Sequence, residues 1–118
     1  MVTCALPLHM LTIREYVDPN GHSPFAKWFR GLNAPAAAKV TTSLVRIEQG
    51  NFSNTKGVGA GVFECRIDFG PGYRIYFGKD GDALVILVGG GTKKHQDADI
   101  KAAHERWKDY KERKDREI

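Results

Sequence analysis

Two arginines and a short basic run in the second half of the chain carry side chains that could bind a phosphodiester. Arg66 and Arg74 lie in two neighbouring segments, and Lys93, Lys94 and His95 follow a run of three glycines. Arginine binds phosphate through a planar fork and lysine as a point charge, whereas histidine titrates near neutral pH. These residue types therefore indicate recognition of a phosphate with a group beside it that can move a proton.

The alternation of apolar and charged residues predicts where these side chains point. Over 62–69 and again over 73–77, apolar residues take the odd positions, so we expect two strands with one apolar face. The turn at 70–72 predicts a hairpin with Phe69 opposite Tyr73, which would place Asp68 opposite Arg74. The other face then carries Glu64, Arg66, Asp68, Arg74 and Tyr76. The Tyr76 ring on that face could stack on a base.

The remaining elements follow from spacing and caps. We expect a strand over 10–17, a helix from Ser23, a second helix from about Asn33 to Gly50, a fully apolar strand over 83–88 and a last helix from near 97. Short turns make the three later strands an antiparallel meander. The order strand, helix, helix, three-strand meander, helix predicts an α+β fold, an antiparallel sheet with helices on one face. The glycines at 89–91 are expected to lead out of the apolar strand.

Composition sets the limits of this interpretation. The chain has 118 residues, with 18 Lys and Arg against 14 Asp and Glu. This length predicts one domain over 1–118, with a core at about 10–110. We expect the charged tail at 111–118 to fray. Cys4 and Cys65 are too few for a disulfide framework or a zinc site, and Cys65 is expected in the core. No metal, cofactor or membrane span is predicted. The first residues make a poor signal peptide, which favours the cytoplasm.

Two interpretations of the charged face remain open. Charged residues on an exposed strand face usually provide solvation and cross-strand ion pairs, of which Asp68 with Arg74 would be one. The meander, however, returns the end of the apolar strand to the level of Tyr73, so Lys93, Lys94 and His95 should emerge beside Arg74. The convergence of three segments weakens the solvated-surface interpretation, and the residues alone leave both interpretations open.

Two strings of sequence carry a resemblance to a known family. The stretch GVFECRIDFGPGYRIYF, followed by ALVILVGGGTKKHQDADIKAA, resembles toxins of the RelE/ParE superfamily from bacterial toxin–antitoxin modules. It looks most like the phage-derived, HigB-like addiction-module killer proteins. The similarity runs from Leu11 to about Tyr110 in the same order of elements. It implies a microbial-RNase-like fold and a cytoplasmic toxin neutralised by a cognate antitoxin, commonly a helix-turn-helix DNA-binding protein, in a hetero-oligomer.

The resemblance also implies an activity, which is metal-independent cleavage of messenger RNA on the ribosome. The ribose 2′-hydroxyl attacks its own phosphate, which requires a base, cations for the developing charge and an acid for the leaving oxygen. By position, Arg66 and Arg74 would clamp the phosphate, and His95 would act as acid or base. The basic loop of the family is matched by Lys93 and Lys94, and a basic RNA-binding residue by Lys56. No tyrosine of the last segment is placed to stack on the base, so Tyr76 is the candidate.

Two alternatives stay open beside the ribonuclease. ParE-like members share the fold, lack a nuclease site and inhibit DNA gyrase. A third possibility is an inactive module component that only binds its antitoxin.

Overall fold

The computed structural model describes residues 10–116; residues 1–9, with Cys4 and the segment weighed as a signal peptide, and residues 117–118 lie outside it. The elements are β1 (Thr12–Glu15), α1 (Pro24–Arg30), α2 (Ala34–Glu48), β2 (Thr55–Gly57), β3 (Val62–Ile67), β4 (Tyr73–Asp80), β5 (Leu84–Thr92), a 3-10 turn η1 (Lys93–His95) and α3 (Gln96–Arg116). No helix within residues 10–116 is both long and apolar enough to cross a membrane.

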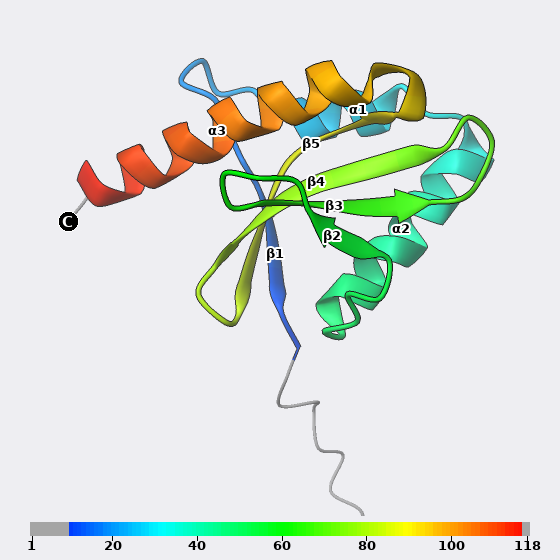
Figure 1. Cartoon of the computed structure of the whole chain (residues 1–118), viewed down its shortest axis with the longest axis horizontal. Helices are drawn as coiled ribbons and strands as arrows, with labels where there is room; N and C mark the ends of the chain where they lie inside the picture. Colours follow the sequence, from blue (N-terminus) through cyan, green and yellow to red (C-terminus); the bar gives the residue numbers. More distant parts are fainter. Residues whose placement is uncertain (1–9, 117–118) are drawn as a thin grey trace, which may run out of the picture.

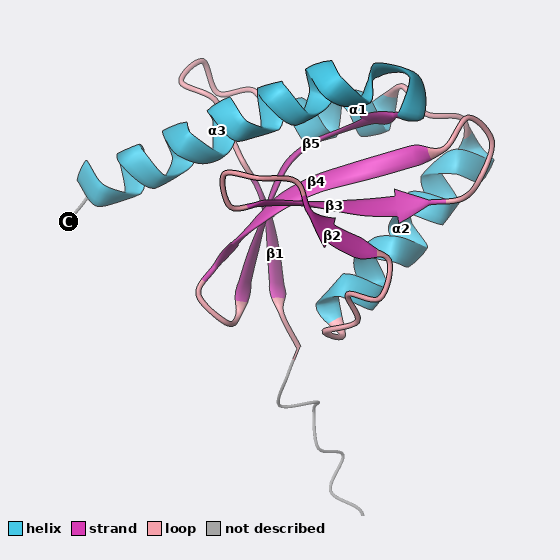
Figure 2. Ribbon diagram, in the orientation of Figure 1, coloured by secondary structure: helices cyan, strands magenta, loops and turns pink. Residues whose placement is uncertain are grey.

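The sheet has five strands in the order β1-β5-β4-β3-β2, which confirms the α+β class (Figures 1 and 2). The predicted meander is present, because β3 pairs antiparallel with β4 and β4 antiparallel with β5. Two features differ from the prediction. β1 pairs parallel with β5, so the sheet is mixed, and β2 adds an edge strand to β3. The segment of β2, Thr-Lys-Gly, is too short and polar to show an alternation.

The predicted helix starts are confirmed in atomic detail. The Ser23 hydroxyl oxygen accepts a hydrogen bond from the Ala26 backbone N–H at 3.0 Å. The Asn33 side-chain oxygen accepts one from the Ala36 backbone N–H at 2.9 Å. Each cap satisfies a backbone donor that the first helical turn leaves without a partner. These caps fix where α1 and α2 begin.

The faces of the central strands agree with the predicted parity, although the predicted pairing does not. Tyr73 pairs with Ile67 rather than with Phe69, and Arg74 pairs with Arg66 rather than with Asp68. The pairing moves by two residues on one strand, because the connection runs from Asp68 to Gly72 and Phe69 lies outside the ladder. A shift by an even number preserves parity. Odd-numbered apolar residues of β3 and β4 therefore form one core with residues of α1, α2 and β5, and Phe63 and Phe69 of the same face pack against it partly buried. The buried members are Phe25, Ala36, Val40, Ile47, Cys65, Ile67, Tyr73, Ile75, Phe77, Val85 and Leu87.

Helices cover both faces of the sheet, not one as predicted. α3 lies on the face opposite α1 and α2, where it closes a second core of Tyr16, Val62, Tyr76, Ile86, Val88, Ala103 and Trp107 (Figure 1). β5 is apolar at odd and even positions alike, and a strand of that kind is buried on both sides. The apolar stripe of α3 supplies the second cover.

The glycines at the end of β5 belong to the strand instead of leading out of it. A Cβ at Gly90 would overlap the Trp28 ring of α1, whereas one at Gly91 would overlap the Asp99 carboxylate of α3. These two consecutive glycines therefore face opposite sides of the sheet, as strand geometry requires. The missing side chains let α1 and α3 approach the same strand from its two faces.

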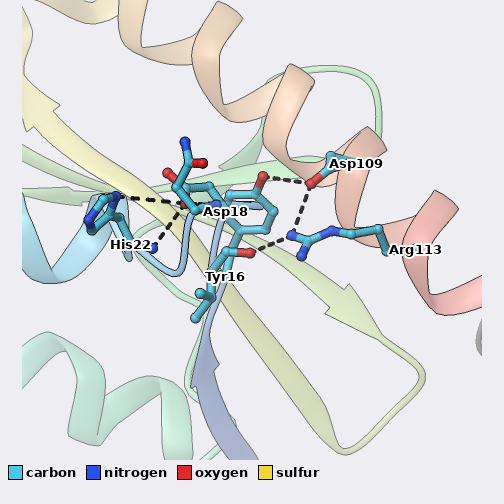
Figure 3. Close-up of polar contacts among 7 residues, drawn as sticks. Tyr16, Asp18, His22, Asp109 and Arg113 are labelled. Carbon is cyan, nitrogen blue, oxygen red and sulfur yellow. Dashed lines mark hydrogen bonds and ion pairs between the residues drawn. The ribbon is translucent and has the colours of Figure 1, made fainter.

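A polar network holds the last turns of α3 against the end of β1 (Figure 3). The Tyr16 hydroxyl donates to Asp109 at 2.7 Å, and Arg113 lies 2.9 Å from the same carboxylate oxygen. Arg113 also donates to the backbone carbonyl of Val17, and its guanidinium lies 5.2 Å from the centre of the Tyr16 ring. The helix itself continues to Arg116.

This network predicts a specific loss of stability at alkaline pH. Burial, with a smaller contribution from Asp109, raises the pKa of Tyr16 from 10.0 to about 12. The folded state therefore keeps the phenol proton where the unfolded chain has lost it. The stabilisation is complete below the unfolded pKa and is lost as the pH rises through the folded pKa. In urea titrations from neutral pH to about pH 11, wild type should lose about 1.4 kcal/mol more than Tyr16→Phe.

The phenylalanine variant supplies its own control at neutral pH. There it should be less stable than wild type by about 1 kcal/mol, because it lacks the hydrogen bond to Asp109. Parallel curves for the two proteins across the alkaline range would show that the Tyr16 proton does not contribute.

Candidate functional site

The three strands of the meander bring two of the predicted site residues and the start of η1 together. In register, Arg66 lies opposite Arg74, and Arg74 lies opposite Gly91, just before the basic run. The carbonyl oxygen of Gly72 accepts a hydrogen bond from the Lys93 backbone N–H at 2.9 Å and another from Arg74 Nη1 at 3.2 Å. The predicted convergence of Arg74 and Lys93 is therefore present.

Five of the predicted site residues form an exposed group that we call the cationic surface: Lys56, Arg66, Lys93, Lys94 and His95. Lys56 pairs with Glu64 across β2 and β3, so it shares the face of Arg66. Within residues 10–116, none of the five lies within ion-pair distance of a carboxylate. Exposed cations without carboxylate partners create a positive potential that attracts anions.

A buried carboxylate lies beneath this surface. Glu64 is 0% exposed, and its Oε2 accepts hydrogen bonds from the Tyr76 hydroxyl at 3.1 Å and from Gln96 Nε2 at 2.8 Å. Arg74 Nε lies 3.5 Å from the same oxygen, and Oε1 has no hydrogen-bond partner among the described residues. Glu64 thus joins β3, β4 and the first residue of α3.

Sequence reasoning placed Glu64 on this face but assigned it no role, and it missed Gln96. The signal for Glu64 was available, since an acidic residue between two apolar neighbours shares the parity of Arg74. No signal pointed to Gln96, because its contact depends on which face α3 covers.

Two of the predicted site residues are buried by α3. Tyr76 is 0% exposed and donates to Glu64, so its ring has no open face on which a base could stack; the predicted stacking role is not supported. Burial, with the adjacent Glu64 carboxylate second, raises the pKa of Tyr76. Arg74 is 6% exposed and held by Glu64 and Gly72, which suits positioning of the loop better than free binding of a phosphate.

A second carboxylate, that of Asp99, lies near the start of α3, over the face of β5 that α3 covers. Asp99 packs over the bare backbone of Gly91. Desolvation raises the pKa of Asp99, and the nearby charges of His95 and Arg106 lower it in part. His95, a member of the cationic surface, therefore lies close enough to Asp99 for its charge to act on that carboxylate.

Cys65 lies in the core, as predicted, and takes no part in the site. Its side chain packs with the α1 and α2 core, and burial raises the pKa of the thiol to about 11. A thiol that stays protonated at neutral pH is a poor nucleophile.

Comparison with known proteins assigns the chain to a family. Residues 27–108 match the family described as Phage derived protein Gp49-like (DUF891), a range that contains the whole cationic surface with Glu64, Arg74 and Gln96. An uncharacterized protein of Haemophilus influenzae is 46% identical over 80 residues, which cover 67% of this chain and 81% of the relative. The chain therefore belongs to the phage-derived Gp49-like family, and this membership indicates a toxin of toxin–antitoxin type.

Proposed function

We propose that this protein is the toxin of a type II toxin–antitoxin module and acts as RelE and HigB-like toxins do. In this proposal it cleaves messenger RNA on the ribosome. The observation that carries the proposal is the cationic surface, in which exposed cations without carboxylate partners and a histidine lie on β2, β3 and η1, with β4 connecting the last two. A ribonuclease needs these groups, because cleavage builds negative charge on a phosphate and moves two protons.

The proposed reaction is an internal transesterification. The 2′-oxygen loses its proton and forms a bond to phosphorus, the bond from phosphorus to the 5′-oxygen breaks, and that oxygen gains a proton. Arg66 would hold the non-bridging oxygens with its planar fork, and Lys93 and Lys94 would neutralise the developing charge. His95 would transfer a proton on one side of the phosphate. Solvent water would exchange the proton on the other side of the phosphate.

Arg74 has a supporting part in this proposal. Its guanidinium and the Lys93 backbone N–H donate to the same Gly72 carbonyl oxygen. Arg74 therefore helps to hold Gly72, to which the first residue of η1 is bonded. A charge that is already in place when the reaction begins stabilises the transition state without reorganisation. We propose that a cognate antitoxin of the helix-turn-helix type neutralises the toxin in the cytoplasm by covering the cationic surface.

Induced expression without antitoxin, followed by mapping of messenger RNA ends, tests the proposal. We expect growth arrest within minutes, with new 5′ ends inside coding sequences on polysomes and no induction of the DNA-damage response. Arrest with intact messages and DNA-damage signalling would instead identify a gyrase inhibitor. Normal growth would identify a component that only binds its antitoxin.

A further inference from the structure

Two adjoining hollows lie where the β2 edge of the sheet meets α2. The first, of about 230 Å³, is lined by Ser53, Asn54, Thr55, Lys56, Arg66 and Asp68. The second, of about 270 Å³, is lined by Lys39, Thr42, Ser43 and Arg46 of α2, and it shares Asn54, Arg66 and Asp68 with the first. The hollows therefore continue the cationic surface from the α3 side of the sheet round its edge to α2.

The charges along this edge are unbalanced. Four exposed cations line the two hollows, Lys39 and Arg46 on α2 and Lys56 and Arg66 on the strands, against the single carboxylate of Asp68. None of the four cations forms an ion pair with the residues between 10 and 116. Lys39 Nζ lies 5.4 Å from the centre of the Phe69 ring, which does not neutralise its charge. Like charges without carboxylate partners repel one another, and a bound polyanion removes that repulsion and releases counterions.

We infer that single-stranded RNA leaves the cleavage site over the β2 edge and runs along α2, with Lys39 and Arg46 binding its phosphates. This inference rests on the proposed function. The path turns round the edge of the sheet, which a flexible single strand can follow and a stiff duplex cannot. Among the described residues that line the hollows, Ile67 alone is apolar, and it is 7% exposed, so the hollows themselves give a protein segment no apolar anchor.

The salt dependence of RNA binding measures these contacts directly. The probe is a short, fluorescently labelled single strand of 2′-O-methyl RNA, which the enzyme cannot cleave because the attacking hydroxyl is blocked. Each phosphate contact on a single strand contributes about 0.7 to the slope of log K against log salt. The double variant Lys39→Ala/Arg46→Ala of the full chain should therefore reduce the slope by about 1.4 and weaken binding at every salt concentration.

A matched control separates local contacts from net charge. Lys108→Ala/Lys111→Ala removes the same two charges from exposed positions on α3, at the hollow beside Gly61. This variant should keep the wild-type slope. Both double variants should unfold at the wild-type urea concentration, because all four side chains are exposed.

Three results would overturn the RNA path. One is a wild-type slope in Lys39→Ala/Arg46→Ala from a toxin that still cleaves messages, which leaves the proposed function intact. Another is equal loss of slope in the control variant, which would reduce the effect to net charge. The third is displacement of the RNA by poly-glutamate as efficiently as by unlabelled RNA, which would identify a surface for acidic polypeptide. Wild type that neither binds nor cleaves RNA would overturn the proposed function as well.

Discussion

Replacing Arg66 with alanine should abolish growth arrest and slow message cleavage by about 10²–10³-fold, or roughly 3–4 kcal/mol of transition-state stabilisation. The effect is large because Arg66 lies where the cationic surface and the two edge hollows meet. Its guanidinium is exposed and makes no ion pair with the described part of the chain. The charge is therefore available to substrate, and its removal should leave the fold unchanged.

The conservative variant separates charge from geometry. Arg66→Lys keeps the charge and loses the planar fork, so it should restore cleavage only in part. Arg30→Ala on α1 is the matched control, because it removes one exposed arginine outside the site and should arrest growth like wild type. The measurement is the rate of cleavage of polysomal messages after induction, with urea unfolding of each purified variant. Full toxicity of a folded Arg66→Ala protein would exclude phosphate binding by this residue.

The parts of the fold that the sequence predicted are those set by local chemistry. Side-chain alternation follows from strand geometry alone, so the separation of Arg66 from Cys65 onto opposite faces could be predicted without knowing the pairing. The caps at Ser23 and Asn33 are likewise local, because each side chain bonds an N–H three residues later.

The parts that could not be predicted depend on contacts distant in sequence. The turn after β3 includes two glycines with positive φ, 54° at Gly70 and 82° at Gly72, and such a turn admits more than one register. The apolar stripe of α3 indicates that the helix is packed, but it does not indicate against which face of the sheet. That single choice decides the burial of Tyr76 and Arg74, and with it which predicted site residues can reach a ligand.

The buried pair beneath the site gives the largest expected effect on stability. Removing the Glu64 carboxylate by Glu64→Met should lower the free energy of unfolding by about 3–5 kcal/mol, because it leaves the buried Arg74 charge without its partner. Tyr76 and Gln96 would lose their acceptor as well. Tyr76→Phe removes one donor and leaves the charge pair intact, so it should cost only about 1 kcal/mol.

A double variant distinguishes an unpaired charge from a simple packing defect. Glu64→Met/Arg74→Met removes both charges and fills similar volume, so it should be more stable than Glu64→Met alone. Gly72 keeps its bond from the Lys93 N–H in this variant, so the turn beneath the basic run retains one anchor. Urea titrations of wild type, Glu64→Met, Arg74→Met and the double variant give the coupling energy between the two side chains. Additive losses would mean that the two side chains act independently. A double variant that regains stability but cleaves no RNA would indicate that the pair serves cleavage rather than folding. Its contribution would be to position Gly72 and Gln96, and through them the η1 residues of the cationic surface.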